Sequence, residues 1–173
     1  MNQRIAALAA AGLIVSGAGP AWAAGEVELT TRVSGVVESV LVKPGQSVRK
    51  GTVLLRLDRT ILQAHLQEAR AEEARAEADA ADAEREKARA LDLYDRTVSS
   101  TSERDASLLR AARAQAALAS ARAHRVIAQK NLADAELRAP FDGVVSAVPG
   151  WPGTVVAADC QPKPLVVLKP AGR

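Results

Sequence analysis

The chain is poor in aromatic residues and in sulfur. Aromatic residues make up 2% of its 173 residues, and it has one cysteine and one methionine, which is Met1. A single cysteine, Cys160, excludes any disulfide within the chain, and the lack of internal methionine removes thioether metal ligands. We expect Cys160 to be buried or incidental, with pairing to another chain or metal binding as the alternatives. Hydrophobic residues still make up 48% of the chain. Because many of these are alanine, we expect thin interfaces and no thick core.

The chain also lacks a region of one charge sign. Its 23 basic and 20 acidic residues give a net charge of +3, and the two signs are interleaved along residues 58–139. Nucleic-acid binding needs a basic stripe or patch, so we expect no nucleic-acid partner. A glycine-rich phosphate loop and a Ser-His-Asp arrangement are also missing.

Proline and glycine are absent from residues 58–139, which favours long helices there. Apolar residues recur at alternating steps of three and four, as in a coiled-coil seam. The predicted seam of the first helix is Leu62, Leu66, Ala69, Ala76, Ala80, Ala83 and Ala90, with Glu73 and Lys87 at skipped positions. The predicted seam of the second helix is Leu109, Ala112, Ala116, Ala119, Ala123, Val126, Ala133 and Leu137, with Lys130 as the exception.

The polar run from Thr97 to Ser102 interrupts this helical pattern. Ser100 and Glu103 have the spacing of a capping box, which predicts that a second helix begins there. Asp58 is the expected N-cap of the first helix, and Pro140 should end the second helix at about Arg138. We therefore predict an antiparallel hairpin over 58–139; a single helix of about 80 residues is the alternative, which the polar run disfavours.

The segments on either side of the hairpin repeat each other at an offset of 108 residues. Each combines short β-branched runs with glycine and proline, and seven positions match in one register. The pairs are Gly35 and Gly143, Val36 and Val144, Val37 and Val145, Val40 and Val148, Pro44 and Pro152, Gly45 and Gly153, and Val48 and Val156. Neither half can bury its apolar face alone, so we predict that residues 24–57 and 140–173 pair into one sandwich.

The N-terminus has the features of an export signal. A positive start is followed by an apolar stretch and by Ala21-Trp22-Ala23, a small-residue cleavage pattern. We predict that residues 1–23 form a signal peptide, which places the mature chain outside the cytoplasm. Retention as a membrane anchor is the alternative, although Gly17, Gly19 and Pro20 interrupt the apolar run that a membrane helix needs.

Two motifs give the chain a family resemblance. The segment 33–58, which contains Ser34-Gly-Val-Val-Glu-Ser-Val and Lys43-Pro-Gly-Gln-Ser-Val, and the segment Leu137-Arg-Ala-Pro-Phe-Asp-Gly-Val-Val145 resemble the two lipoyl-like halves of periplasmic adaptors, or membrane fusion proteins, of the HlyD-like family. The resemblance implies an α+β fold: a biotinyl/lipoyl-like barrel-sandwich hybrid made of two half-motifs and interrupted by a long antiparallel α-helical hairpin. Members continue into a β-barrel domain and a membrane-proximal domain, so a chain ending at Arg173 is expected to be a short form.

The resemblance also implies a contact site at the hairpin tip. In the branch that serves resistance-nodulation-division (RND) pumps, an Arg, a Leu four residues later and a Ser seven beyond that touch an outer-membrane channel. Arg89, Leu93 and Ser100 have these spacings. A shift of one residue would give the role to Ser99. The alternatives are structural: Ser100 as an N-cap, Arg89 as a solvated charge and Leu93 as local packing.

The resemblance implies a non-enzymatic adaptor of an efflux or secretion complex. Its expected partners are an inner-membrane transporter, an outer-membrane channel and further copies of itself in a ring; no cofactor is expected. One competing function is a biotin- or lipoate-carrier domain, but no modifiable lysine occurs in a Met-Lys-Met or Asp-Lys-Ala context. Another is a free-standing periplasmic coiled-coil scaffold or chaperone. His65 and His124 are expected on a solvated surface of the two helices, without a catalytic or metal role.

Overall fold

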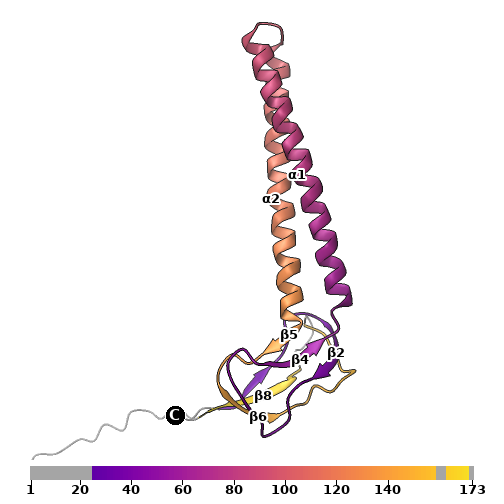
Figure 1. Cartoon of the computed structure of the whole chain (residues 1–173), viewed down its shortest axis with the longest axis vertical. Coiled ribbons are helices and arrows are strands. Elements are labelled where there is room, and N and C mark those ends of the chain that lie inside the picture. Colours follow the sequence, from indigo (N-terminus) through magenta and orange to yellow (C-terminus); the bar gives the residue numbers. More distant parts are fainter. Residues whose placement is uncertain (1–24, 159–162, 172–173) are drawn as a thin grey trace, which may run out of the picture.

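The computed structural model describes residues 25–158 and 163–171. Two long helices lie side by side and stand on a small body of strands (Figure 1). The predicted signal peptide, residues 1–23, and Cys160 lie outside the described residues.

In the part of the chain that the structure describes, eight short strands form two sheets of four, which we call the sandwich. The first sheet has the order β1-β8-β6-β3 and the second the order β5-β4-β2-β7, and every pairing is antiparallel. The strands are β1 (Val27–Leu29), β2 (Gly35–Val40), β3 (Ser47–Val48), β4 (Val53–Leu57), β5 (Glu136–Arg138), β6 (Gly143–Ala147), β7 (Val155–Val156) and β8 (Val166–Pro170).

The sequence repeat is a symmetry of this topology. Strands β2, β3 and β4 of the first half correspond to β6, β7 and β8 of the second, and β1 corresponds to β5. Each strand and its counterpart occupy the same place in opposite sheets. Each half of the chain therefore contributes two strands to each sheet, and neither sheet can form from one half alone. The predicted α+β fold, with two half-motifs in one sandwich, is confirmed.

The sandwich is held together by aliphatic side chains from both halves. Its fully buried members include Leu54 and Leu57 of β4 and Leu168 of β8. The matched turn glycines Gly45 and Gly153 have φ of 85° and 88°, a region that favours glycine because it has no Cβ. Glycine thus stands at the matched position of both turns because the backbone there has a positive φ.

The hairpin consists of α1 (Thr60–Asp95) and α2 (Thr101–Asp134). At about 1.5 Å per residue each helix is roughly 50 Å long. The predicted turn and the helix start at Ser100 are confirmed. Helix α1 begins slightly later than predicted, with Arg59 as its cap residue, although the carboxylate of Asp58 still accepts the Thr60 N–H at 2.9 Å.

The predicted end of the second helix is wrong. Helix α2 ends at Asp134, and Glu136–Arg138 form strand β5 and not a last helical turn. The cause is tertiary: β5 pairs with β4, placing Leu137 opposite Leu55 and burying it in the sandwich core. Leu137 is accordingly a core residue of the sandwich and not a seam residue of the hairpin.

The seam predicted for α1 is confirmed. Leu66, Ala69, Ala80 and Ala83 are buried, and Leu62, Ala76 and Ala90 are half-buried. The skipped position Glu73 is also half-buried, because its carboxylate pairs with Arg125 across the hairpin. The seam of α1 therefore tolerates a polar residue where a cation faces it.

The seam predicted for α2 is wrong. The predicted residues from Leu109 to Ala133 are exposed, with Leu109 at 51% and Val126 at 56%. The residues that face α1 are Ser107, Ala111, Leu118 and Ala121, which are buried, and Arg104, Ala114, Arg125 and Ala128, which are half-buried.

Both stripes of α2 follow steps of three and four, so apolar periodicity alone could not separate them. The larger side chains Leu109 and Val126 made the exposed stripe look more apolar. Cross-helix contacts distinguish the two stripes: Arg125 pairs with Glu73, and the guanidinium of Arg104 lies 4.4 Å from the ring centroid of Tyr94. Arginine at these positions contributes to the seam by pairing and stacking.

Substitutions of two leucines of α2 test this assignment. Leu118 is 6% exposed and Leu109 is 51% exposed. We expect Leu118→Ala to destabilise the hairpin by about 2 kcal/mol, the lower end for a buried leucine because the seam is thin, and Leu109→Ala by no more than about 0.5 kcal/mol. Thermal denaturation followed by far-UV circular dichroism measures both. A larger loss for Leu109→Ala would contradict the seam.

Candidate functional site

The tip of the hairpin is the candidate contact site. Five residues, Arg96 to Ser100, connect α1 to α2. An open hollow of about 560 Å³ lies on one side of the tip. The residues that line it come from both helices and the connection: Glu86, Arg89, Ala90, Leu93, Val98, Ser99, Glu103, Ala106, Ser107 and Arg110.

The structure brings two of the three predicted site residues together. Arg89 and Leu93, one helical turn apart on α1, both line the hollow. Leu93 is 44% exposed, so it is only partly used for packing. Within the described residues, the Arg89 guanidinium has no carboxylate within ion-pair distance, which leaves its charge available to a partner.

Ser100, unlike Arg89 and Leu93, does not line the hollow. It is the N-cap of α2: its Oγ accepts the Glu103 N–H at 3.2 Å, and the Glu103 carboxylate accepts the Ser100 N–H at 2.9 Å. The predicted capping box is thus present. Ser99, and not Ser100, lines the hollow beside Arg89 and Leu93, and its hydroxyl also donates to Glu103, at 2.8 Å.

The turn is strained at Thr97. Its φ of +61° lies in the left-handed region, which costs an L-residue about 1–2 kcal/mol. The conformation is held by backbone bonds from the Thr97 N–H to Tyr94 O at 2.9 Å and from the Val98 N–H to Leu93 O at 3.0 Å. Val98 is left 74% exposed at the end of the arm. Sequence reasoning did not assign Val98 to the site, although an apolar residue within a polar run was a usable signal.

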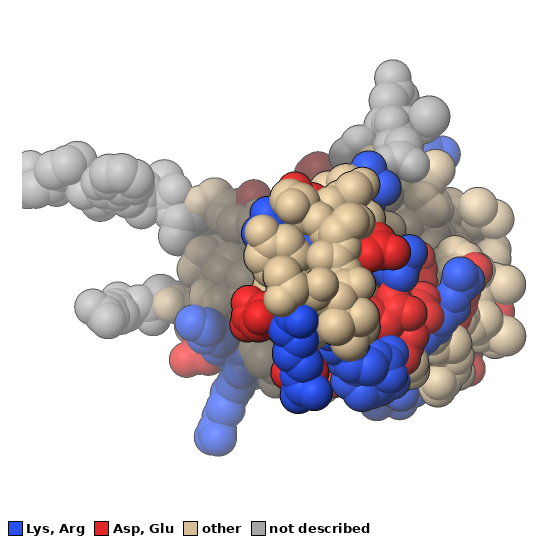
Figure 2. Space-filling model, turned by 90° about the horizontal axis from the view of Figure 1, so that it is seen from above, with Lys and Arg blue, Asp and Glu red and all other residues tan. Residues whose placement is uncertain are grey.

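The view from above shows a mixed surface. Acidic and basic side chains lie next to one another around uncharged residues (Figure 2). The ion pairs of the hairpin include Arg110 with Glu86, near the tip, and Arg122 with Glu77, further down. The tip therefore offers local apolar and charged contacts and not a field of one sign.

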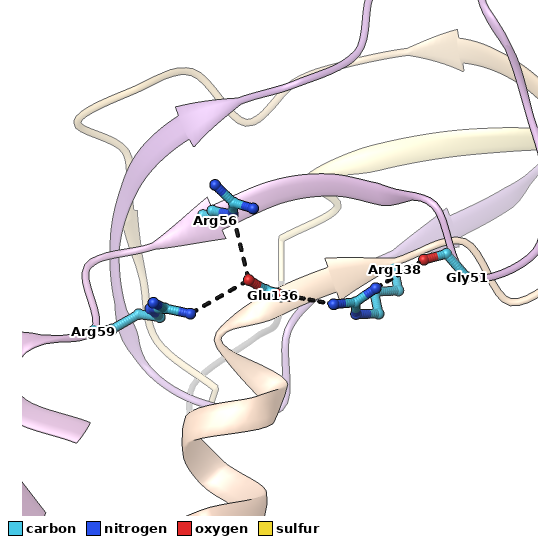
Figure 3. A network of polar contacts seen from close by, with 5 residues as sticks. All are labelled: Gly51, Arg56, Arg59, Glu136 and Arg138. Atoms are coloured by element: carbon cyan, nitrogen blue, oxygen red, sulfur yellow. Dashed lines mark hydrogen bonds and ion pairs between the residues drawn. The ribbon is translucent and has the colours of Figure 1, made fainter. Parts of the chain in front are cut away.

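A second polar cluster, which no sequence pattern predicted, lies where the hairpin joins the sandwich. The carboxylate of Glu136, the first residue of β5, is surrounded by three arginines (Figure 3). Its Oε1 lies 3.3 Å from Arg56 Nε and 3.3 Å from Arg59 Nη1, and its Oε2 receives Arg138. Arg138 also donates to the carbonyl of Gly51 at 3.0 Å. One carboxylate thus connects β4, β5 and Arg59 at the N-cap position of α1.

His65 and His124 share a shallow hollow of about 190 Å³ near the base of the hairpin. Both side chains are exposed, as predicted, and His124 Nδ1 lies 3.7 Å from a Glu72 carboxylate oxygen. In the part of the chain that the structure describes, no group of three or more His, Cys, Asp or Glu side chains is arranged to hold a metal ion. Over the same residues, neither helix has an apolar stretch sufficient to cross a membrane.

Comparison with known proteins gives consistent results. A family model described as CzcB-like, barrel-sandwich hybrid domain, matches residues 25–161. The efflux pump periplasmic linker BepD of Brucella suis biovar 1 is 32% identical over 135 residues, which cover 78% of this chain and 34% of BepD.

Solved structures share the fold. A MacA-MexA chimeric protein, containing the α-hairpin domain of Pseudomonas aeruginosa MexA, has a TM-score of 0.64 and 25% identity, over 84% of this chain and 46% of the chimera. A membrane fusion protein from Streptococcus pneumoniae R6 also has a TM-score of 0.64, at 19% identity, over 84% of this chain and 59% of that protein. The chain thus spans 34% of the curated relative and 46% and 59% of these two structures.

Alanine substitutions of the two tip serines test which of them caps α2. We expect Ser100→Ala to destabilise the hairpin by about 1 kcal/mol, because the first amides of α2 lose their cap. Ser99→Ala removes one hydroxyl contact to Glu103 and leaves the cap in place, so its effect should be smaller. Thermal melts of the two variants at neutral pH provide the comparison; equal losses would contradict the capping assignment.

The same cap should depend on pH through Glu103. The Ser100 N–H, and then the hydroxyls of Ser99 and Ser100, lower the pKa of Glu103 from its ordinary value of 4.5. A lowered folded-state pKa gives stability that is complete above 4.5 and is lost as the pH falls through the folded-state value. The difference in Tm between the parent and Glu103→Gln should therefore be present at neutral pH and disappear in strong acid. A difference that stays constant with pH would show that the carboxylate charge contributes nothing.

Proposed function

Because the chain belongs to the family of CzcB-like barrel-sandwich hybrid domains, we propose that it is a periplasmic adaptor. In this role it couples an inner-membrane transporter of an efflux complex of the RND type, or of a secretion complex, to an outer-membrane channel, and the hairpin tip meets the channel. The relative BepD is described as an efflux pump periplasmic linker, which supports both the role and the compartment. The predicted signal peptide at residues 1–23 supports the same location.

The observation that carries the proposal is the geometry of the tip. An arm of roughly 50 Å ends in exposed Val98 and Leu93 beside Arg89, whose charge has no carboxylate partner among the described residues. Exposed apolar side chains next to an unpaired cation are typical of a protein contact site. In this arrangement Arg89 and Leu93 contact the channel directly, whereas Ser100 acts by shaping the turn. Ser99, which is half-buried, lines the hollow beside them.

We also propose that copies of the chain associate through the outer faces of their hairpins. The exposed stripe of α2, Leu109, Ala112, Ala116, Ala119, Ala123 and Val126, lies about 150° around the helix from the buried seam at 100° per residue. Leu108 and Ile127, 38% and 57% exposed, extend this stripe sideways.

Helix α1 has a matching outer stripe of exposed alanines: Ala64, Ala71, Ala74, Ala78, Ala81 and Ala88. The α2 stripe, which carries leucine, valine and isoleucine besides alanine, can pack against the all-alanine stripe of α1 on a neighbouring copy. Such a contact joins two different surfaces, so repeated copies close into a ring when the rotation allows it. The spacing of both stripes is that of the internal seam, which supports side-by-side packing of hairpins.

A non-enzymatic role agrees with the side chains present. The two histidines lie in a shallow, exposed hollow, and the described carboxylates are paired with arginine or lysine or are solvated. Among the described residues no lysine stands at a turn between the two halves, where a carrier domain presents its modified lysine; the hairpin occupies that place. No specific observation in the structure favours a carrier domain or a free-standing scaffold.

The tip contact can be tested by crosslinking in cells. With a photo-crosslinking residue at Val98, the parent chain should form an adduct with an outer-membrane channel protein. We expect Arg89→Glu combined with Leu93→Asp to abolish the adduct, because both the cation and the apolar contact are replaced by acids. The matched control is Arg70→Glu with Ile61→Asp, which makes the same charge change on exposed residues at the base of α1. Undiminished crosslinking of the tip variant, with helicity intact, would sink the assignment.

The outer stripe can be tested by sedimentation velocity. We expect Leu109→Lys with Val126→Lys to prevent association, because both charges would be placed in the apolar contact, and to leave Tm unchanged because both side chains are exposed. Gln115→Lys with Ser120→Lys adds the same charge to exposed positions outside the stripe and should associate as the parent does. A parent chain that stays monomeric at all concentrations, or a stripe variant that associates normally, contradicts the proposed packing.

A further inference from the structure

The hairpin is a long lever on a small base. Among the described residues, the helices meet the sandwich at their lower ends, where Leu62 packs against the sandwich core and Ala135, directly after α2, is fully buried. For an arm of roughly 50 Å, a tilt of about 10° at the base moves the tip by roughly 9 Å. A contact that fixes the base therefore decides where the tip lies.

Glu136 is placed to make such a contact. It follows α2 by two residues, and its carboxylate accepts a hydrogen bond from Arg59, the residue at the N-cap position of α1, at 3.3 Å. The same oxygen lies 3.3 Å from Arg56 of β4. The start of one helix, the end of the other and the sheet between them thus share one acid, as Figure 3 shows.

Burial and charge make this contact stronger than an ordinary surface pair. The Glu136 side chain is 14% exposed, whereas those of Arg56, Arg59 and Arg138 are 46%, 41% and 54% exposed. A half-buried carboxylate with several guanidinium partners is screened less by solvent than an exposed pair. Without its negative charge, three guanidinium groups would remain around a neutral side chain, and their mutual repulsion would favour release of Arg59.

We infer that Glu136 is a positioning residue that fixes the direction in which the hairpin leaves the sandwich, by holding Arg59 of the α1 cap against the strand that follows α2. The backbone bonds between Leu57 N and Ala135 O at 2.9 Å, and between Asp58 N and Val36 O at 2.8 Å, keep the chain connected at this point. They lie at the pivot and leave rotation about it open. The Glu136–Arg59 contact resists that rotation, whatever partner the tip meets.

Double electron–electron resonance, which measures the distribution of distances between two spin labels, tests the inference on the folded chain. The labels are attached at Lys43→Cys in the sandwich and Ser102→Cys at the tip, both exposed positions, in a Cys160→Ser background. We expect Glu136→Gln to broaden the distance distribution by several ångström, as a swing of about 10° of the arm requires. Arg59→Gln, which removes the link to α1 alone, should reproduce the broadening.

Two control variants separate positioning from general charge loss. Glu38→Gln removes an exposed acid of β2 from the same sandwich and should leave the distribution unchanged. Arg138→Gln removes a partner of the same carboxylate whose other tie, to Gly51, lies within the sandwich, and should also leave it unchanged. Helicity and Tm are recorded for each variant, and if Glu136→Gln does not fold, Arg59→Gln decides the question.

An unchanged distribution in both Glu136→Gln and Arg59→Gln would overturn the inference. Equal broadening in Arg138→Gln would also overturn it, because the effect would then come from the charge balance of the sheet and not from the link to α1. A loss of Tm without broadening identifies a purely stabilising role. Since none of these measurements uses a partner, failure of the tip contact in cells would leave this result intact.

Discussion

The structure depends on the antiparallel pairing of β4 with β5. These strands come from different halves of the chain, yet Leu57 N donates to Ala135 O at 2.9 Å where one helix begins and the other has ended. Any excursion between β4 and β5 must return to its starting point, which an antiparallel hairpin does and a single long helix cannot. The pairing also requires the second half of the sequence, because each sheet takes strands from both halves. The sandwich therefore forms only when the hairpin brings the second half of the chain back to the first.

The two helices of the hairpin pack against each other mainly through small side chains. Alanine in the seam lets the two helices approach closely but buries little area per turn, so arginine pairs such as Arg125 with Glu73 contribute where apolar packing is thin. The same composition leaves apolar stripes on the outer faces. An alanine-rich hairpin is thus suited to side-by-side packing with similar hairpins, since its inner and outer surfaces follow one spacing.

The tip and the base of the hairpin have different sets of contacts. At the tip, capping by Ser100 and a strained Thr97 hold a short turn that exposes Val98 and keeps Arg89 and Leu93 together. At the base, Glu136 connects the two helix ends to the sheet. The contact that we propose at the tip requires the direction of the arm to be set, which is the role that we propose for Glu136 at the base.

The sequence by itself determined the architecture, because the 108-residue repeat, the run without proline or glycine and the Ser100–Glu103 capping box are local or periodic signals. The family resemblance also led to the prediction that Arg89 and Leu93 form the contact site at the tip. Tertiary structure alone decided the phase of α2, since two stripes of equal period compete and only the facing helix selects between them. It also converted Glu136–Arg138 from helix to strand, because β4 offers hydrogen bonds there, and it gathered Arg56, Arg59, Glu136 and Arg138 from both ends of the hairpin. Charges that lie about 80 residues apart in the chain carry no periodic signal, so only the closed fold could reveal their contact.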